Sequence, residues 1–339
     1  MEQTEVQYCF QSSNSSCPKE VRPTAVYVVM YISAAAVVML TMCGNLMVII
    51  SISHFKQLHT PTNLLVLSLA VADFLIGVTV MPFCLIVLIE TCWYFGETVC
   101  IIYNTLRFVL TSVSINHVAC IAIDRYFAVC DPLLYSTKIT VNITWLIIML
   151  NWLISLLYNL ALIYFNGNMN GVEEITICYG DCLFAISETW VIVDLLVVFI
   201  LPCSVMIILY LKVFVVAKKH VKVISAIREH KSSNDENKSK KITIKSERKA
   251  VKTLGIVIAV FLLCLVPYYI CTLVDTNVSL SSSSVVINFL FWLLYFNSAV
   301  NPIIYALFYP WFQKSVKLIV TLRIFKPASS LLNLFPQKL

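Results

Sequence analysis

Charged side chains are scarce in this chain of 339 residues, because Asp, Glu, Lys and Arg together make up only 12% of it. A soluble domain carries about 25% charged residues. Hydrophobic residues make up 60% of the chain, and its mean hydropathy is +0.87. This balance excludes an ordinary soluble domain and indicates that lipid is the solvent for most of the chain.

Glycine is scarce as well, and the motifs of enzymes are missing. The chain has seven glycines and no internal repeat that we can detect. Transporters tend to show repeats and glycine-interrupted helices, so a transporter or channel is a disfavoured alternative. We find no phosphate-binding loop, no Cys and His cluster with metal-ligand spacing and no nucleophile with a matching base. We therefore expect no enzymatic activity.

Long apolar runs dominate the chain instead. Seven stretches are long enough to cross the hydrocarbon core, which takes about 20 residues. Only helices and closed barrels satisfy their backbone groups in lipid, and these continuous runs lack the alternation of a barrel. We predict an all-α membrane protein, a seven-transmembrane helix bundle over residues 25–308. The predicted spans are 25–51, 62–89, 97–130, 141–164, 187–216, 250–275 and 285–308.

The distribution of charge predicts the direction of the spans. The segments on one side hold two basic residues, Lys19 and Arg22, against ten acidic ones; these segments are 1–24, 90–99, 165–188 and 275–284. Nearly all other Lys and Arg residues fall on the opposite side, which should be cytoplasmic. We therefore expect a multi-pass protein of the plasma membrane, with residues 1–24 extracellular and a basic cytoplasmic loop at about 217–249.

The two ends of the chain carry further signals. After the seventh span Pro310 should end the helix, and basic and apolar residues then follow at helical spacing. Residues 309–339 are therefore expected to form a short amphipathic helix in the membrane interface and a cytoplasmic tail. Among four Asn-x-Ser/Thr sequons, Asn14 is the best candidate for glycosylation, because Asn142 and Asn237 fall inside and Asn277 lies close to the membrane.

Ionisable residues inside the spans are few, and each is a functional candidate because charge is costly in lipid. Two of them, Arg107 and Arg125, share the third span and lie about 27 Å apart along it. Arg107 should therefore lie near the outer third of the bundle and Arg125 at the cytosolic boundary. Asp124 can hold Arg125 in an ion pair until something displaces it; the alternative is an arginine that only snorkels to the interface.

Each span also carries a short motif, and these motifs occur in the order of a known family. They are Gly44-Asn45, Leu69-Ala70-Val71-Ala72-Asp73, Asp124-Arg125-Tyr126, Trp152, Pro202 with Tyr210, Phe261 with Pro267, and Asn301-Pro302-Ile303-Ile304-Tyr305. Over essentially the whole chain they resemble the rhodopsin-like G-protein-coupled receptors. The resemblance implies a heterotrimeric G protein as partner and no nucleic acid. The residues implied in coupling and activation are Asp124, Arg125, Tyr126, Tyr210 and Tyr305.

The same resemblance implies a polar network at mid-membrane depth. Its members would be Asp73, Ser114, Asn297, Ser298 and Asn301. These oxygen-bearing side chains could surround a sodium ion, as they do in the family, and no other cofactor is expected. The alternative is a plain buried hydrogen-bond network.

A narrower resemblance comes from the seventh span and the loops. The run from Asn297 to Phe312 is similar to the signature of trace amine-associated receptors, which are vertebrate olfactory receptors for amines. The resemblance implies the disulfides Cys100–Cys182 and Cys17–Cys178, with Cys9 as a competing partner of Cys178, since spacing does not fix connectivity. It also implies a stimulatory or olfactory-type G protein and a rise in cyclic AMP.

Two positions depart from the family pattern. Amine receptors place an Asp on the third helix where this chain has Arg107, and a cation there repels an amine. A fish-type branch of the family lacks that acid and has one on the fifth helix, so we predict that Asp194 pairs with the ligand's ammonium group. The second departure is Leu265, which replaces the usual Trp of the sixth helix. Activation should then couple through other contacts, such as Phe261 and Tyr268. A non-signalling decoy receptor is a rival, but the intact coupling motifs argue against it.

Three hypotheses stay open for Arg107. It pairs with Asp194 in the empty receptor, or it binds a carboxylate, which would make the ligand an amino acid, another zwitterion or an anion, or it snorkels outward and touches no ligand. Aromatic residues of the last two spans could form walls for an alkylammonium group, although plain packing is their commoner role. The predicted ligand-binding residues are Asp194, Arg107, Tyr268, Tyr269, Trp292 and Tyr295.

Overall fold

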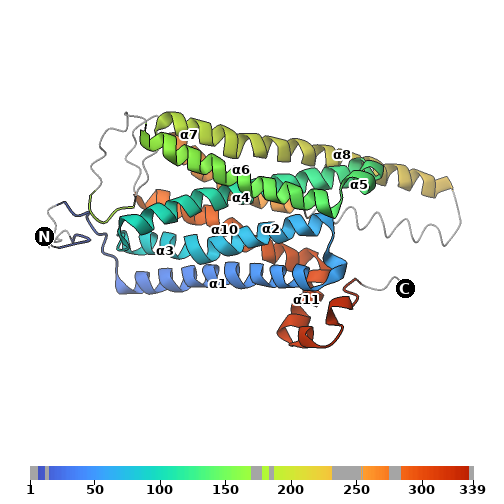
Figure 1. Ribbon diagram of the computed structural model, residues 1–339, viewed down its shortest axis with the longest axis horizontal. Helices are drawn as coiled ribbons and strands as arrows, with labels where there is room; N and C mark the ends of the chain where they lie inside the picture. The colour runs from blue at the N-terminus through green and yellow to red at the C-terminus, as the bar shows by residue number, and fades with distance from the viewer. Residues whose placement is uncertain are drawn as a thin grey trace.

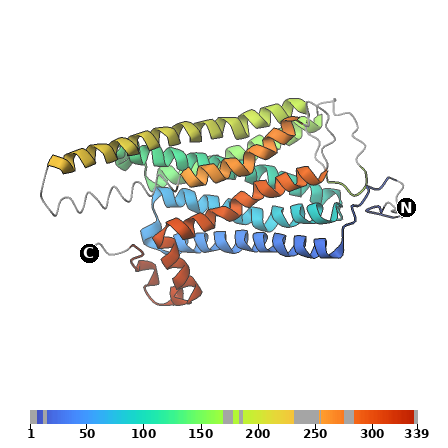
Figure 2. The same cartoon turned by 180° about the vertical axis from the view of Figure 1, so that it is seen from behind.

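The computed structural model shows a bundle of long helices that run side by side (Figures 1 and 2). It describes residues 7–11, 15–168, 178–182, 187–230, 253, 255–274 and 284–335. The N-terminal segment from residue 7 lies at one end of the bundle, which we call the outer end, and the last helix lies at the other. The glycosylation candidate Asn14 and most of the predicted cytoplasmic loop fall outside the described residues.

Seven spans make up the bundle, and two of them combine several helical segments. They are α1 (Thr24–His54); α2 (Pro61–Leu75), η2 (Ile76–Val80) and α3 (Met81–Glu90); α4 (Gly96–Cys130); α6 (Val141–Asn168); α7 (Glu188–Asp194), η3 (Leu195–Ile200) and α8 (Leu201–His230); the helix Gly255–Val274; and α10 (Ser284–Phe308). Six are long and apolar enough to cross a membrane, and Trp292–Phe308 of α10 is a shorter apolar helix. The predicted all-α seven-helix bundle is confirmed, although α8 continues to His230, past the predicted end at 216.

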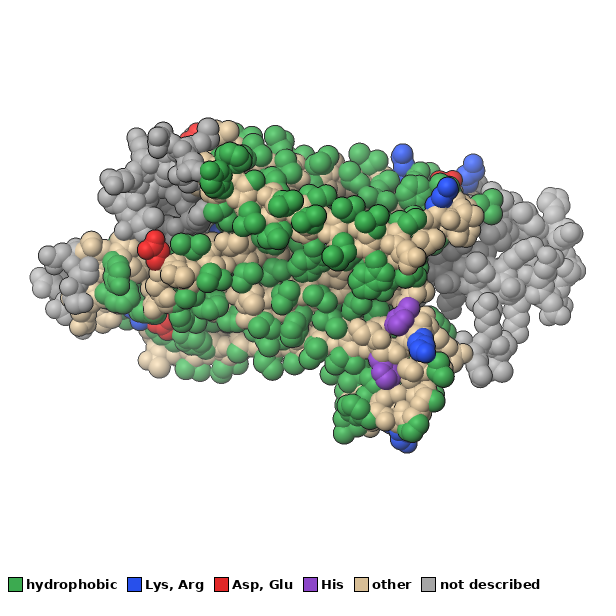
Figure 3. Space-filling view, in the orientation of Figure 1, with side chains coloured by type: hydrophobic (Ala, Val, Ile, Leu, Met, Phe, Trp, Pro, Cys, Tyr) green, Lys and Arg blue, Asp and Glu red, His purple; other side chains and the backbone are tan. Residues whose placement is uncertain are grey.

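The surface of the bundle fits a lipid environment. Hydrophobic side chains cover most of its long side, and the visible charged side chains lie toward its two ends (Figure 3). On α6 the exposed residues Leu146, Met149, Leu153 and Leu157 recur at helical spacing. The opposite side of that helix buries a polar row, Asn151, Ser155 and Asn159. Helices of this kind face lipid with their apolar side and hydrogen-bond their neighbours with the other.

Two spans contain a widened, π-helical turn that the sequence analysis did not predict. Each turn ends two residues before a proline: η2 ends directly before Met81-Pro82, and η3 ends directly before Leu201-Pro202. Proline has no N–H to donate, and its ring collides with the carbonyl group one turn earlier. A wider turn before the proline relieves this conflict. The turn η3 begins directly after Asp194, so it sets the direction in which that side chain leaves the helix.

The inner end carries two further helices. The short helix α5 (Pro132–Lys138) follows the Asp124-Arg125-Tyr126 motif and was not predicted. The predicted amphipathic helix is α11 (Pro310–Val320), and Tyr309 before it is extended, as residues that precede proline are. Beyond α11, residues 321–335 contain η4 (Arg323–Phe325) and η5 (Ser329–Leu331) and fold back toward the end of α1. We call this segment the tail clasp.

The tail clasp is held by packing and by hydrogen bonds. Leu334 is buried in one apolar cluster with Phe55 and Tyr305. The backbone N–H of Leu334 donates to Gln57 Oε1 at 3.1 Å, and His54 Nε2 lies 3.0 Å from Ser329 Oγ. The tail therefore packs as part of the inner end rather than trailing from it.

Candidate functional site

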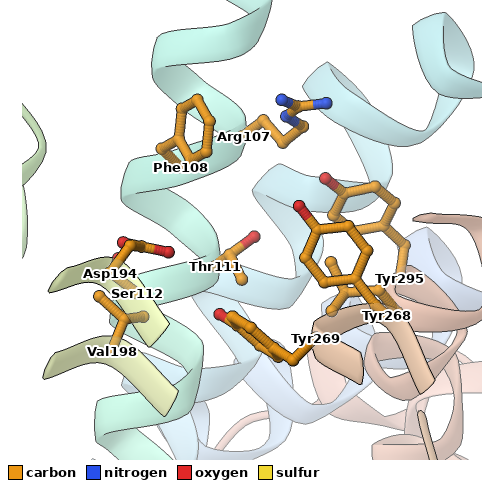
Figure 4. Close-up of a pocket in the computed structure, with 10 residues that line it drawn as sticks. Arg107, Phe108, Thr111, Ser112, Asp194, Val198, Tyr268, Tyr269 and Tyr295 are labelled. Atoms are coloured by element: carbon orange, nitrogen blue, oxygen red, sulfur yellow. The ribbon is translucent and has the colours of Figure 1, made fainter. Parts of the chain in front are cut away.

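A cavity lies in the outer half of the bundle, between α4, the α7–η3 segment and the last two spans (Figure 4). It encloses about 360 Å³ of empty space, including the part open to solvent, and adjoins a second cavity of similar size. Both cavities are lined by Asp194, Phe108, Tyr268 and Tyr269. The predicted ligand-binding residues therefore meet around one space, with a single exception.

The exception is Trp292, which is half-buried and packs against the main core cluster. It is not among the residues that line either cavity in the described part of the chain. On α10 the residues that face the cavity are Leu294 and Tyr295. Trp292 lies two residues before Leu294, about 200° around the helix, but three before Tyr295, which puts those two only about 60° apart. It packs into the core cluster beside the cavity, and its predicted contact with the ligand stays a prediction.

The structure also adds lining residues that the sequence analysis missed. They are Phe108, Thr111, Ser112, Val198 and Leu294. Helical spacing from the predicted residues could have found two of them, because residues four apart lie on the same face of a helix. Thr111 follows Arg107 and Val198 follows Asp194 at that spacing.

Asp194 lies where α7 meets the widened turn η3, and its side chain is half-buried. The Tyr158 hydroxyl of α6 donates to Asp194 Oδ1 at 3.3 Å. Among the described residues no cationic side chain pairs with this carboxylate. Nothing in the sequence signals the role of Tyr158, because most of α6 faces outward. The result is an acid whose charge the protein itself leaves largely uncompensated.

Arg107 lines the same cavity but points away from Asp194 (Figure 4). Its guanidinium carbon lies 4.8 Å from the ring centre of Phe108 and 5.7 Å from that of Tyr103, within the range of cation–π contacts. The predicted Arg107–Asp194 ion pair is therefore not formed in this structure. The reason is that aromatic rings on its own helix hold the arginine on the other side of the cavity.

An aromatic stack joins the fifth and sixth spans beside the cavity. The rings of Phe199 and Tyr269 lie 4.2 Å apart with an angle of 19° between their planes. Below Tyr269, at successive helical turns, Leu265 and Phe261 are both buried. This buried column leads from the cavity toward the inner half, along the route on which the sequence analysis placed Phe261.

Three disulfides close the outer end of the bundle. They are Cys9–Cys92, Cys17–Cys178 and Cys100–Cys182. Two of these pairings are those that the resemblance implies, and Cys9 bonds to Cys92 rather than competing for Cys178. Cys17, Cys178 and Asp181 lie within metal-ligand reach of one another, but both sulfurs are bonded and offer no thiolate.

Backbone contacts press the N-terminal segment against the loop at 178–182. Short antiparallel and parallel bridges join Tyr8 to Pro18 and Ser16 to Tyr179. Gly180 has φ +107°, and a Cβ there would lie 2.9 Å from Cys9 Cβ, so only glycine fits. We call residues 7–11, 15–19 and 178–182 the outer cap. Burial raises the pKa of the Asp181 carboxyl in this cap, although the Cys182 N–H that donates to it acts in the opposite sense.

An ion pair fastens the cap to the second span. Lys19 Nζ donates to Glu90 Oε2 at 2.8 Å, and this hydrogen bond raises the pKa of Lys19. Arg22 donates to the carbonyl groups of Leu88 and Ile89 at the end of α3. Terminal carbonyls of a helix lack partners within the helix, so Arg22 caps α3.

The polar network around Asp73 lies at mid-depth and is fully buried. Asp73 accepts hydrogen bonds from Asn301 Nδ2 at 2.7 Å, Ser298 Oγ at 2.8 Å and Ser114 Oγ at 3.3 Å. The structure thus brings together four of the five predicted residues. Asn297 is buried as well but makes no hydrogen bond to Asp73 among the described residues.

At the inner end Asp124 is saturated with donors. Arg125 donates to Asp124 Oδ2 from Nη2 at 2.6 Å and from Nε at 3.0 Å. Thr62 Oγ1 at 2.7 Å and the Tyr135 hydroxyl at 2.9 Å donate as well. Thr62 of α2 and Tyr135 of α5 were not among the residues predicted from the sequence. Arg125 is thus held in place by an acid that is itself anchored on two sides.

Among the described residues, none of the three tyrosines predicted to take part in coupling hydrogen-bonds to this pair. Tyr126 packs against Val213 and Ala217 of α8. The Tyr210 hydroxyl lies against Gly255 of the sixth span. The ring of Tyr305 contacts those of Tyr309 and Phe312, with centres 5.8 Å and 6.3 Å away. Asp124 holds Arg125 in this structure, and Tyr210 and Tyr305 have other neighbours.

Comparison with known proteins gives one consistent result. Residues 44–305 match the family described as 7 transmembrane receptor (rhodopsin family). The chain is 46% identical over 332 residues to trace amine-associated receptor 13c of Danio rerio, covering 97% of this chain and 96% of that protein. It is 42% identical to trace amine-associated receptor 4 of Mus musculus, covering 98% and 96%. It is also 41% identical to trace amine-associated receptor 8a of Rattus norvegicus, covering 99% and 98%.

Proposed function

Because the chain belongs to the rhodopsin family of seven-transmembrane receptors, and within it to the trace amine-associated receptors, we propose that it detects amines through Asp194. It is a multi-pass membrane receptor rather than an enzyme, with a small-molecule ligand and a heterotrimeric G protein as its partners. In this proposal the ammonium group of the ligand lies in the outer cavity and pairs with the Asp194 carboxylate.

One observation carries the proposal: Asp194 faces two adjoining cavities and has no cationic partner among the described residues. A carboxylate in a partly buried site is stabilised by an entering cation. The aromatic rings of Phe108, Tyr268 and Tyr269 share these cavities and favour an alkylammonium group through cation–π attraction. Tyr158 would hold the carboxylate in the orientation that receives the ligand.

We further propose that ligand binding favours a state in which Arg125 leaves Asp124. An ammonium group that pairs with Asp194 would pull the fifth span toward the ligand. The stack of Phe199 on Tyr269 links that span to the sixth. Movement of their inner ends would free Tyr210 and Tyr305 to approach Arg125. Ligands shift populations only through such differential contacts. The G protein would be of the stimulatory or olfactory type, and cyclic AMP would rise.

A sodium ion at Asp73 is a separate proposal. The side chains of Asp73, Ser114 and Ser298 offer oxygen atoms as ligands, which suits a hard cation. In this structure three donors already point at the carboxylate, which is the geometry of a hydrogen-bond network. Both serine hydroxyls can rotate to present their oxygens to an ion. A sodium-dependent shift in agonist potency that disappears in Asp73→Asn would support the ion.

We also propose that the receptor lies in the plasma membrane with its N-terminus extracellular. Disulfides persist in an oxidising compartment, and all three join outer segments. Asn14 would then be accessible to the glycosylation machinery. Antibody labelling of an N-terminal tag on intact cells tests the orientation, and a mobility shift that is lost in Asn14→Gln tests the glycan.

The test of the ligand site is a cyclic-AMP reporter assay in cells that express the receptor. The n-alkylamines, diamines and n-alkyl carboxylates are compared on wild type, Asp194→Asn and Glu97→Gln. Glu97 is an exposed acid at the outer start of α4, so its variant controls for loss of outer charge. Receptor at the cell surface is measured through the N-terminal tag, and responses are compared at equal surface density.

We expect amines to activate wild type and Glu97→Gln alike. In Asp194→Asn the concentration for half-maximal response should rise at least about thirtyfold, because removing one partner of a desolvated charge pair costs about 2 kcal/mol or more. Activation of wild type by carboxylates alone, with no effect of Asp194→Asn, would contradict the proposal. It would favour the alternative in which Arg107 anchors an anion.

A further inference from the structure

The cavity that contains Asp194 has a second charged wall of opposite sign. Arg107 lines the same space, and its guanidinium group is turned to the side opposite the Asp194 carboxylate (Figure 4). The rings of Phe108 and Tyr103 hold it there through cation–π contacts. The cavity therefore presents an acid on one side and a base on the other, with aromatic surface between them.

Hydroxyl groups reinforce the basic side. Tyr295 is only 2% exposed and lines the cavity, and its hydroxyl has no hydrogen-bond partner among the described residues. Figure 4 shows the hydroxyls of Tyr295 and Tyr268 on the side of the cavity that Arg107 occupies. Both are electrostatic neighbours of the guanidinium. A buried O–H without an acceptor costs free energy, so an acceptor atom of a ligand beside the Tyr295 hydroxyl would be stabilised there.

We propose that Arg107, Tyr295 and Tyr268 form an anion subsite in the ligand cavity, so that the preferred ligand is an amine that also carries an anionic group. The inference rests on the proposed function, because it takes the ammonium contact at Asp194 as given. A guanidinium presents N–H donors in a planar fork, and the Tyr295 hydroxyl adds an O–H donor beside it. Such a donor set matches the oxygen atoms of a carboxylate.

Charge balance distinguishes this ligand from a simple amine. A monoamine would gain the attraction of Asp194 and feel the repulsion of Arg107 across one water-poor cavity. A ligand with both charges gains an attraction at each end of the cavity. The same arginine that disfavours a monoamine thus favours an amine with an anionic group.

The geometry also limits the spacing of the two ligand charges. Because Arg107 points away from Asp194, we expect an α-amino acid, whose charges are adjacent, to contact only one of the two groups. An ω-amino acid places a hydrocarbon spacer between its charges, and that spacer would lie against Phe108 and Tyr268. Potency should therefore pass through a maximum as the spacer grows.

The experiment compares three matched series in the cyclic-AMP assay. They are straight-chain ω-amino acids from β-alanine upwards, their neutral ω-amides, and n-alkylamines of the same chain length; ω-aminosulfonates ask whether the subsite accepts another anion. The variants are Arg107→Gln, Arg107→Lys and Tyr295→Phe. Tyr94→Phe is the control, because Tyr94 is an exposed tyrosine of the outer end that lines neither cavity.

In wild type we expect the best ω-amino acid to be at least about tenfold more potent than its amide and its alkylamine, since a hydrogen bond to a charged group contributes on this scale. Arg107→Gln should remove that advantage and leave alkylamines as potent or more potent. Arg107→Lys should retain part of it, because the charge stays and the fork is lost. Tyr295→Phe should weaken only the ω-amino acids, and Tyr94→Phe should change nothing.

The failures of the two proposals look different. If alkylamines match ω-amino acids on wild type and Arg107→Gln affects both series equally, the anion subsite is wrong and the amine receptor stands. If n-alkyl carboxylates without an amine are as potent as ω-amino acids, the two-ended ligand is also wrong. If no amine of any series activates wild type at normal surface density, the proposed function fails, and this inference fails with it.

Discussion

The inner and outer halves of the bundle treat their buried acids in opposite ways. At mid-depth, where the inner half begins, Asp73 accepts three hydrogen bonds from the protein. At the inner end, Asp124 accepts from Arg125, Thr62 and Tyr135. Outside, Asp194 accepts one bond from Tyr158 and faces a cavity. The cost of burying a charge is met by the protein itself in the inner half. In the outer half, on the proposed function, it is met by the ligand.

This difference separates a general switch from a particular sensor. The inner residues form closed contacts that need nothing from outside, and they fall within the motifs shared with the rhodopsin family. In the outer half the Asp194 carboxylate faces a cavity, and Arg107, which departs from the pattern of amine receptors, lines the same cavity.

The largest expected effect tests the contrast between the two acids directly. Asp73→Ala leaves three buried donors without an acceptor, so it should lower the free energy of unfolding by about 3 kcal/mol or more. Asp194→Ala removes the acceptor of a single long hydrogen bond and should change it by less than about 1 kcal/mol. Thermal unfolding of the two variants in detergent, without ligand, measures both. Equal losses of stability in the two variants would contradict the proposed difference between the two acids.

The second effect asks whether the outer cap is stable independently of the bundle. Replacing Cys17 and Cys178 by Ser removes a crosslink between segments 161 residues apart in sequence. Loss of a disulfide costs about 2–4 kcal/mol. We expect faster hydrogen exchange in residues 15–19 and 178–182, with little change in α1 or α4. Replacing Cys9 and Cys92 is the matched variant, and a loss of protection that spreads through the inner half in either one would show that the halves are not separable.

Close backbone approaches offer a third test, one in each half. A Cβ at Gly44 would lie 2.7 Å from Pro302 Cβ, where α1 meets α10, so Gly44→Ala should destabilise the bundle by about 1–3 kcal/mol. Gly180→Ala meets Cys9 and a positive φ, so it should loosen the cap instead. Gly96→Ala is the control, because it has a positive φ but open space around it. Exchange rates resolved by region should assign each loss to its own half.

The smallest effect concerns Asp181 in the cap. Burial raises the pKa of its carboxyl, so the folded cap favours the neutral form. Its stabilising contribution is present below the unfolded pKa, near 3.8, and is lost as the pH rises through the raised folded value. Asp181→Asn should therefore slightly raise the thermal midpoint near neutral pH and flatten its dependence in the acid range. An unchanged pH profile would show that this carboxyl is solvated.

The sequence predicted the architecture well because lipid imposes a simple rule on apolar length. All seven spans follow from it, whereas α11 was predicted from Pro310 and the helical spacing of the basic and apolar residues after it. The ion pair of the inner site could also be predicted from the sequence, because Asp124 and Arg125 are adjacent in the chain. The polar network needed α2, α4 and α10 to meet, and only the family motifs indicated which residues would face one another.

The outer site was harder to predict, and the reasons are local. Trp292 lies on nearly the same face of α10 as Tyr295, yet of the two only Tyr295 lines the cavity, so helical spacing does not separate them. The widened turn η3 sets the direction of Asp194 through an effect of Pro202 that hydropathy does not register. Tyr158, the hydrogen-bond partner of Asp194, lies on α6, and the many exposed apolar residues of that helix give no sign of which side chains face the bundle. Contacts across helices, rather than patterns within them, built this site.

The tail clasp has a practical meaning for anyone who handles this receptor. Leu334 shares its apolar cluster with Phe55 and with Tyr305 of the Asn301-to-Tyr305 motif, so the tail clasp supports the end of the seventh helix. A fluorescent protein or purification tag that replaces residues 321–335 would remove this support and disturb the part of the molecule whose signal it is meant to report. Fusions should therefore keep residues 321–335 intact.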